Sequence, residues 1–587
     1  MEPLAHRARP VQRISKVRRD YNRWVATETL EDYALRFTPR SFRRWSPFRV
    51  ANTAFGAVSF LALEAIGASI TFSYGFVNAM WAIGVVALVI FLTGLPIAYT
   101  AARHGLDMDL LTRGAGFGYL GSTITSLIYA GFTFIFFALE AAIMAQAFEL
   151  WFDMPRSAGY LLSAVVVIPL VTHGITLISR LQLWTQPLWL ALLALPYAAI
   201  AIRQPEALEA FTSLNGRSGD GDTFAWPAFG AAATVAAALI AQIGEQVDYL
   251  RFMPEPKAGK RWQWWLALVV SGPGWILLGA AKMVGGALLA FVALQAEIPI
   301  TRAIEPTRMY LTGFSVAVGP GGVAVLLTGA FVLISQIKIN VTNAYAGSLA
   351  WSNFFARITH SHPGRVVWLI FNVLIAVLLM AMGVFEALER VLGLYAHLAV
   401  AWVGAIVADL VVCKPLRLSP PGIEFRRAYL FDINPSGFGA MMLASACSIA
   451  AYLGSFGEGL RPASAAIALG LAFLASPVIA LATGSRFFVA RTPTDFGSRH
   501  RLVRCTVCRN RFESEDIASC PAYGGAICSL CCTLDARCGA VASPRPRRTS
   551  NSPSGSVACC RWASRDRCCA GSASSRSSSP AWRWSSA

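Results

Sequence analysis

Three charged side chains, Glu64, Glu140 and Lys338, lie several helical turns from the ends of long apolar runs. A charged group at that depth in a membrane is costly, so each is a candidate for a function that requires a partner. A buried lysine without a counter-charge would lose its proton, and a buried carboxylate would gain one. Two carboxylates and a lysine in three separate runs therefore predict one shared polar site near the midplane, with a purely structural ion pair as the alternative.

Acidic groups nearer to the ends of apolar runs have simpler explanations. Asp248 precedes Arg251 by three residues, and Asp409 precedes Lys414 by five. Because both acids lie close to a membrane surface, we expect them to form local pairs with these basic residues rather than to bind a ligand.

Small and polar residues interrupt two of the apolar runs. The stretch EAIGASITFSYG, from Glu64 to Gly75, contains Gly67 and Ser69 among several poor helix formers. Such a stretch can unwind and expose backbone groups to a ligand. The run 225–250 contains a weaker counterpart in AALIAQIGEQVDY, which includes Gln242. Interruptions in the first and sixth runs are what a five-plus-five inverted repeat produces, although close helix packing explains a single glycine equally well.

Cysteines concentrate near the end of the chain. Two pairs with the spacing Cys-x2-Cys, starting at Cys505 and Cys528, resemble the knuckles of a tetrahedral Zn²⁺ site, with an iron–sulfur cluster or redox thiols as alternatives. A reducing, cytoplasmic location disfavours disulfides. The candidate metal ligands are Cys505, Cys508, Cys520, Cys528, Cys531, Cys532 and Cys538.

The elements that must position these groups are apolar segments long enough to cross a bilayer. The chain has 587 residues, of which 55% are hydrophobic and 14% charged, whereas soluble domains carry about 25% charged residues. The sequence therefore predicts an all-α polytopic membrane protein with twelve spans. Their expected positions are 52–73, 76–100, 118–149, 159–179, 183–202, 225–250, 264–294, 313–346, 365–385, 391–413, 437–456 and 463–484.

Basic residues indicate how the chain is oriented. Residues 1–48 are rich in arginine and contain no apolar signal segment, and basic residues recur in alternate connections after them. The positive-inside rule then places both termini in the cytoplasm. The net charge of +18 indicates attraction to anionic lipid. Nucleic acid is not an expected partner, because no basic run is interleaved with stacking aromatics.

Five stretches, in order and at matching spacing over about residues 45–485, resemble the nucleobase:cation symporter-1 family of purine, cytosine, uracil, allantoin and hydantoin permeases. The stretches are LLTRGAGFGYLGS, GEQVDYLRFMPEP, NVTNAYAGSLAWSNFF, GAIVADLVV and YLFDINPSGFGA. The resemblance implies a leucine-transporter-like fold, in which ten spans form a 5+5 inverted repeat and two more follow. It also implies a small-molecule substrate bound between spans one, three, six and eight.

The resemblance extends to a substrate site for a nucleobase-like molecule. Phe136 and Glu140 match an aromatic residue and a glutamine four residues later that contact the base in the family. The aromatic residue expected in span six is replaced by Leu239 or a neighbour. The candidate substrate-binding residues are Glu64, Gly67, Ser69, Phe136, Glu140, Gln242, Asn340 and Asn343.

The resemblance also suggests how transport is coupled to an ion. Family members that use Na⁺ place small hydroxyl residues about a turn and a half before the substrate-binding asparagine of span eight. If Asn343 is that asparagine, Lys338 occupies the sodium position and its ammonium stands in for the cation, so that coupling is either to H⁺ or absent. If Asn340 is, Ser335 occupies it. The candidate ion-coupling residues are Ala65, Ser335 and Lys338.

We therefore expect a basic arm (1–48), a twelve-helix permease domain (49–490), a cysteine-rich cytoplasmic module (491–540) and a low-complexity segment (541–587), the last being either a disordered tail or an out-of-frame reading. The favoured function is secondary active transport across a bacterial-type cytoplasmic membrane. The alternative is a transporter-like sensor that relays ligand binding to a cytoplasmic signalling partner. An enzyme is not expected, because the spans contain no nucleophile with a base, metal triad or phosphate loop.

Overall fold

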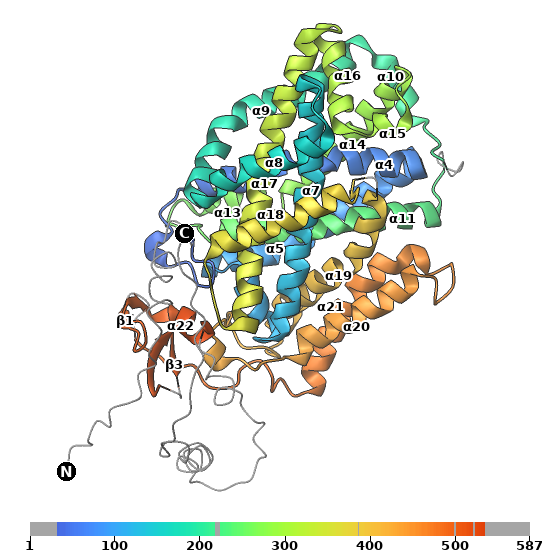
Figure 1. The fold of residues 1–587 in the computed structure, drawn as a ribbon. Coiled ribbons are helices and arrows are strands. Elements are labelled where there is room, and N and C mark those ends of the chain that lie inside the picture. The colour runs from blue at the N-terminus through green and yellow to red at the C-terminus, as the bar shows by residue number, and fades with distance from the viewer. Residues whose placement is uncertain (1–31, 218–222, 386, 498–500, 521–522, 535–587) are drawn as a thin grey trace, which may run out of the picture. The chain divides into compact units, whose positions relative to one another are not determined.

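The protein is largely α-helical, and long helices follow one another through most of the chain (Figure 1). The computed structural model describes residues 32–217, 223–385, 387–497, 501–520 and 523–534. Within these ranges, eight helices are long and apolar enough to span a membrane, and a bent pair makes a ninth. Cys538, most of the basic arm and the low-complexity segment lie outside the described residues.

The helices lie where the apolar runs predict them. The bent span is α3 (Pro47–Phe55), η2 (Gly56–Ser59) and α4 (Ala62–Tyr74). It is followed by α5 (Phe76–His104), α7 (Gly121–Phe152), α8 (Arg156–Thr172), α9 (Ile175–Arg203), α11 (Trp226–Ala237) with η4 (Ala238–Gln242) and α12 (Ile243–Leu250), α13 (Arg261–Ser271) with α14 (Trp275–Gln295), α17 (Gly322–Thr359), α18 (Arg365–Ala381), α19 (Leu388–Ala408) with η5 (Asp409–Cys413), α20 (Pro435–Tyr452) and α21 (Ser464–Ala482). These elements make up the twelve expected spans within the described part of the chain, so the all-α polytopic fold is confirmed.

The first span is broken, but not where its small residues suggested. Phe60 has an extended backbone (φ −63°, ψ 134°), and the halves of the span meet at 45° around it. From Ala62 onward α4 is a regular helix through Gly67 and Ser69, so the prediction that the stretch from Glu64 to Gly75 unwinds was wrong. Gly67 is small for a packing reason, because a Cβ there would lie 2.0 Å from the carbonyl oxygen of Met283 on α14.

The sixth span has a counterpart to this break. The helix tightens into the 3-10 segment η4, which ends at Gln242, between α11 and α12. Interruptions in spans one and six therefore both exist, as the inverted repeat requires.

Two span boundaries differ from the sequence prediction. Gly174, with φ +76°, separates α8 from α9, so the fourth span ends and the fifth begins earlier than expected. The segment 319–321 contains two more glycines with positive φ and separates a short helix, α16 (Pro306–Val318), from α17. Glycine adopts these left-handed conformations without a Cβ clash, which is why the apolar runs continue in sequence while the helices end.

The centre of the permease region consists of paired helices. α17 packs along α7, α4 packs along α14, and α19 packs along α21. α7 and the composite span α11–α12 are mostly buried, whereas no more than 39% of the most apolar window of α9 and of α5 is buried. The groups that could perform chemistry therefore come from spans one, three, six, seven and eight, at the interior.

A small α+β module follows the helices. β1 (Leu502–Arg504) pairs antiparallel with β2 (Arg511–Glu513), with Val503 opposite Phe512. β3 (Ile517–Cys520) pairs antiparallel with β4 (Gly525–Cys528), which leads directly into α22 (Ser529–Leu534) (Figure 1). The first Cys-x2-Cys motif lies in the turn between β1 and β2, and the second runs from the end of β4 into α22, and the two motifs lie side by side.

Candidate functional site

The break in the first span is held by a lysine from α14. Lys282 Nζ donates hydrogen bonds to the carbonyl oxygens of Val58 (2.9 Å) and Phe60 (2.6 Å). It also forms an ion pair with Glu64, at 3.4 Å from Oε2, and both side chains are buried. Carbonyl groups at a helix break have no intrahelical partner, so the ammonium satisfies groups that would otherwise bind water or a cation. Tyr310 donates to the other carboxylate oxygen of Glu64 at 2.8 Å.

Glu140 holds the other side of the same break. Its carboxylate accepts hydrogen bonds from the backbone N–H groups of Leu61 (3.0 Å) and Ala62 (2.9 Å). These are the first amides of α4, whose terminus carries partial positive charge, so a buried anion is favoured there. Glu140 is therefore an N-terminal cap for the second half of the broken span.

Lys338 lies on a different side of α17. Its Nζ donates to Gln186 Oε1 (2.9 Å) and Thr185 Oγ1 (3.2 Å), both on α9. The ammonium is thus directed at span five rather than at the break in span one. The indole ring of Trp189 lies 5.8 Å from Lys338 Nζ and 5.6 Å from Lys282 Nζ, so both ammonium groups contact the same aromatic ring.

Ser335, one turn before Lys338, contacts the break from α17. Its carbonyl oxygen accepts from Ser59 Oγ at 3.1 Å, and its hydroxyl accepts from Trp189 Nε1 at 2.9 Å. Of the two positions that the sequence offered for an ion, Ser335 is therefore the one beside the unwound segment.

Asparagine side chains extend the polar surface of α17. Asn340 and Asn343 are both fully buried, and the described part of the chain offers no hydrogen-bond partner to any of their four amide atoms. Burial without partners costs roughly 1–3 kcal/mol per group, so such a pair indicates a place that a ligand or water fills. On span six, Gln242 Nε2 donates to Glu245 Oε2 at 2.8 Å.

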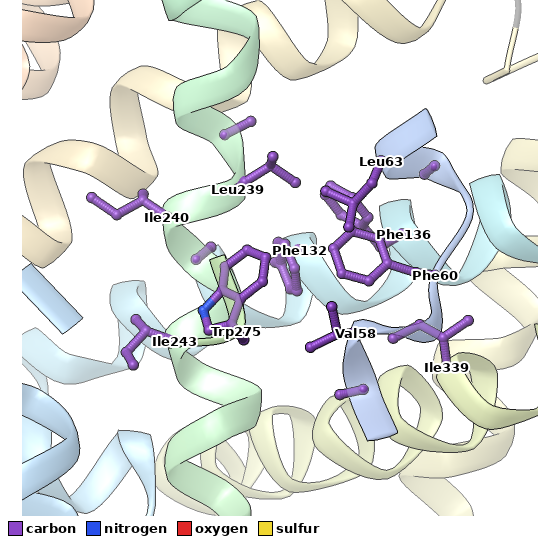
Figure 2. Packing of buried hydrophobic residues seen from close by; sticks show 14 of the residues in the cluster. Val58, Phe60, Leu63, Phe132, Phe136, Leu239, Ile240, Ile243, Trp275 and Ile339 are labelled. Atoms are coloured by element: carbon purple, nitrogen blue, oxygen red, sulfur yellow. The ribbon is translucent and has the colours of Figure 1, made fainter. Parts of the chain in front are cut away.

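Aromatic rings gather next to the break (Figure 2). The ring of Phe60 lies 5.9 Å from that of Phe136 and 6.1 Å from that of Trp275, measured between centroids. The ring of Phe132 lies 4.5 Å from that of Phe136, tilted by 32°. Figure 2 shows Leu239 and Trp275 in the same cluster of buried side chains as these rings. Trp275, at the start of span seven, is therefore a large aromatic residue of this cluster, whereas span six contributes Leu239.

A cavity of about 920 Å³ lies at the other end of α4. Ala65 and Ser69 line it together with Thr234 of α11. Ser69 donates a short hydrogen bond to Glu389 at the start of α19, and Ser73 donates to the same oxygen at 3.1 Å. Two residues predicted for substrate or ion binding therefore face this cavity rather than the break.

Sequence reasoning missed three residues of this region: Lys282, Trp275 and Trp189. A signal existed for the first two, because LLGAAKMVGG places a lysine deep inside the run 264–294, and SGPGW places a tryptophan directly after a Gly-Pro-Gly interruption. No comparable signal marked Trp189, which lies among several tryptophans and leucines on α9.

Charged residues form a dense network between the helix ends that the sequence places on the cytoplasmic side. Asp109, on α6 (Met108–Thr112), is paired with Arg113 at 3.0 Å and with Arg357 of α17. The expected ion pair of Asp248 with Arg251 is not the one formed. Arg251 pairs with Asp107 at 3.6 Å and donates to the backbone oxygen of Asp248.

Asp248 instead accepts from the hydroxyl of Tyr129 at 2.8 Å. The expected pair of Asp409 with Lys414 is confirmed, at 3.3 Å.

Four cysteines of the terminal module form a candidate metal site. The sulfur atoms of Cys505, Cys508, Cys528 and Cys531 all lie within 4.8 Å of one another. Cys520 and Cys532, which were also predicted as ligands, are buried in the same apolar cluster but are not among these four. Four thiolates from two knuckles are the donor set of structural zinc sites, so the residues fit the metal that their spacing predicted.

Comparison with known proteins places the fold. No known family profile matches the sequence, and no curated protein matches it. The structure is similar to that of Mhp1, a nucleobase-cation-symport-1 family transporter, in a closed conformation with bromovinylhydantoin bound. The TM-score is 0.57 at 17% identity, covering 76% of this chain and 96% of that one.

The inward-facing conformation of Mhp1 matches with a TM-score of 0.55 at 17% identity, over 77% of this chain and 94% of that one. A Na⁺-coupled sialic acid symporter in a substrate-bound, outward-open state matches with a TM-score of 0.51 at 13% identity, over 79% of this chain and 94% of that one. The chain therefore has the leucine-transporter-like fold of membrane symporters, as predicted.

Proposed function

We propose that the protein is a secondary active transporter of the nucleobase:cation symporter-1 type, which carries a small, polar, nucleobase-like molecule across a cytoplasmic membrane by alternating access. The observation that carries this proposal is the break in the first span. Its carbonyl oxygens and its amides are held by Lys282 and Glu140, which come from two other spans. A pair of half-helices held by charged side chains near the midplane is suited to binding a solute and to opening on alternate sides.

The substrate site that we propose lies between the aromatic cluster and α17. Phe136 and Trp275 supply flat apolar surfaces, and Asn340 and Asn343 supply donors and acceptors for the edge of a heterocycle. Gln242 would contribute from span six. Because buried amides are costly without partners, a molecule whose edge matches them is selected over one that only fills the space.

The remaining predicted residues have other tasks in this proposal. Glu64 and Glu140 maintain the break, and Gly67 permits close packing of α4 on α14. Ala65 and Ser69 line the route through the large cavity. Both termini would lie in the cytoplasm, as the positive-inside rule indicates.

For coupling, we propose that Lys282 takes the place of a coupling cation and that protons drive transport. The ammonium already occupies the carbonyl oxygens of the break and has Glu64 as its counter-charge. The Lys282–Glu64 pair can then exchange a proton when the break becomes accessible to water. Lys338 contacts span five and has no part in this coupling.

The test is uptake by the full chain in proteoliposomes, with radiolabelled uracil, cytosine, hypoxanthine and hydantoin as probes. An inward proton gradient is expected to concentrate one of these compounds, with no response to a sodium gradient. Asn343→Ala should reduce uptake by ten-fold or more, whereas Cys447→Ser, on the partly exposed face of α20, should leave it unchanged. Absence of gradient-driven accumulation of all four compounds would contradict the proposal.

A further inference from the structure

We infer that Cys505, Cys508, Cys528 and Cys531 bind Zn²⁺, and that the metal-dependent fold of their module clamps residues 32–43 across the end of the helix bundle, so that zinc occupancy restrains opening on that side. The gating part of this inference rests on the proposed transport function, and the metal site and the clamp do not.

The four cysteines have the local geometry of zinc knuckles. Backbone N–H groups point at the sulfurs, with Cys528 N 3.4 Å from Cys505 Sγ and Cys531 N 3.5 Å from Cys528 Sγ. Such N–H contacts stabilise thiolate charge, as outer-shell donors do in metal sites. Cys508 Sγ and Cys528 Sγ are 3.9 Å apart, close to the separation of two sulfurs bound to one ion.

The module is too small to fold on packing alone. Its strands have three or four residues each and its helix has six. Its buried apolar residues, including Ile517, Ala518 and Ile527, form one cluster with the cysteines themselves. Domains of this size usually depend on a metal or on disulfides, so loss of zinc should unfold the module.

The module holds the segment before the first span through charged contacts. Arg36 Nη2 lies 3.3 Å from Asp516 Oδ2, and its guanidinium lies 4.4 Å from the centroid of the Phe512 ring. Arg40 pairs with Glu515 at 3.1 Å, and its backbone N–H donates to Glu513 at 3.0 Å. Glu513 ends β2, and Glu515 and Asp516 lie in the short 3-10 turn η8 (Ser514–Asp516) that joins β2 to β3, so these contacts require the folded module.

The same segment is bonded to the helices. Arg251, at the end of span six, donates to the backbone oxygens of Asp32 (2.7 Å) and Tyr33 (3.4 Å). Asn353 of α17 donates to the backbone oxygen of Ala34 at 3.1 Å. The segment therefore links spans six and eight, so any movement of one span away from the other on this side must break these hydrogen bonds.

A second attachment fixes the module itself to the permease region. Arg426 donates to the backbone oxygen of Ile517 at 2.8 Å, and the hydroxyl of Tyr429 accepts from Ser519 N at 2.9 Å. Tyr429 is also part of the apolar cluster of the module. One side of the module is bonded to residues 426–429 of the permease region, and the other side is bonded to residues 32–43, so the module acts as a clamp.

The experiment uses the full chain in nanodiscs. Metal analysis should find about one zinc ion per chain, lost after treatment with a high-affinity chelator. Hydrogen–deuterium exchange should then accelerate by about ten-fold or more in residues 32–43 and at the ends of spans six and eight, and re-addition of zinc should reverse the change.

Two variants separate the clamp from the metal. Arg36→Gln should retain zinc yet raise exchange in residues 32–43, because it removes the guanidinium that pairs with Asp516 and leaves the module itself unchanged. Glu458→Gln, which changes an exposed acid paired with Arg461 on another face, should alter neither. A chain without stoichiometric zinc, or one whose exchange in residues 32–43 is the same with and without zinc, would overturn the inference. Neither readout requires transport, so failure of the transport proposal is seen separately in the uptake assay.

Discussion

Replacing Lys282 with methionine tests the most unusual contact of the structure, an ammonium that binds two carbonyl oxygens at the break in a membrane helix. Methionine retains much of the length and apolar bulk of lysine but removes the charge and all three donors. The variant therefore leaves the carbonyl oxygens of Val58 and Phe60 without their bond and leaves Glu64 without its counter-charge.

We expect Lys282→Met to lower the free energy of unfolding strongly, because Glu64 remains buried. Removing one partner of a buried ion pair costs about 3–5 kcal/mol, since the other charge stays in a low-dielectric environment. Lys338→Met is the matched control. It removes two hydrogen bonds to the uncharged side chains of Thr185 and Gln186, and it also removes the cost of burying the ammonium. Because these effects oppose each other, we expect the free energy of unfolding to change by about 1 kcal/mol.

A second substitution reports on the pair itself. Glu64→Gln in the Lys282→Met background removes the stranded charge, so the double variant should recover about 2 kcal/mol relative to Lys282→Met alone. Recovery of this kind is not expected when Glu64→Gln is combined with Lys338→Met.

The assay is the apparent melting temperature of the purified protein in detergent, measured for both single variants and both doubles, together with uptake. Lys282→Met should melt well below Lys338→Met and should abolish uptake. Equal melting temperatures for the two lysine variants, or failure of Glu64→Gln to raise that of Lys282→Met, would refute the assignment of the ion pair.

Two further predictions concern single acids. Glu140→Gln should lower the free energy of unfolding by about 1–2 kcal/mol, because one of the two oxygens that accept from the N–H groups at the start of α4 becomes an NH2 group, which cannot accept, and because the anion is lost. Glu140→Ala should lower the free energy of unfolding further; equal stability of these variants and the native chain in thermal unfolding would contradict the capping role. Burial raises the pKa of Asp107, between α5 and α6, to about 6 against the opposing effect of Arg251. The folded chain then binds this proton more tightly than the unfolded chain, so the free energy of unfolding should rise as the pH falls through about 6. The Asp107→Asn variant should show a smaller rise in the free energy of unfolding between pH 7.5 and 5.5.

The fold was predictable because its signals are long and repeated. Apolar runs of membrane length fixed the spans, and the glycines that end helices caused the boundary errors, since Gly174 and the segment 319–321 interrupt helices without interrupting hydrophobicity. The cysteine spacing correctly paired the knuckles, because two residues between cysteines bring both sulfurs to one side of a turn.

The candidate site was predictable only in part. That Glu64 and Glu140 need partners followed from burial, but the identity of the partner of Glu64 did not, because helix packing decides which lysine reaches it. Lys282 and Lys338 are both single lysines in apolar runs, and only the pairing of α4 with α14 distinguishes them. The break itself was misplaced for a related reason, because Gly67 is needed for close contact with α14 and the serines that follow it bond to Glu389, so these poor helix formers do not mark an unwound segment.

The position of Lys282 also determines whether a sodium ion can bind at the break. A sodium ion about 4 Å from a fixed ammonium would be repelled by about 4 kcal/mol at an effective dielectric constant near 20, a loss of roughly a thousand-fold in affinity. The native chain should therefore show no stabilisation by sodium over potassium or choline. Lys282→Ala removes the ammonium but keeps Glu64 and the two carbonyl oxygens, which are oxygen ligands of the kind that a hard cation prefers. Sodium should then raise the melting temperature of this variant and not that of Lys338→Ala, whereas sodium stabilisation of the native chain would show that the lysine does not stand in for a cation.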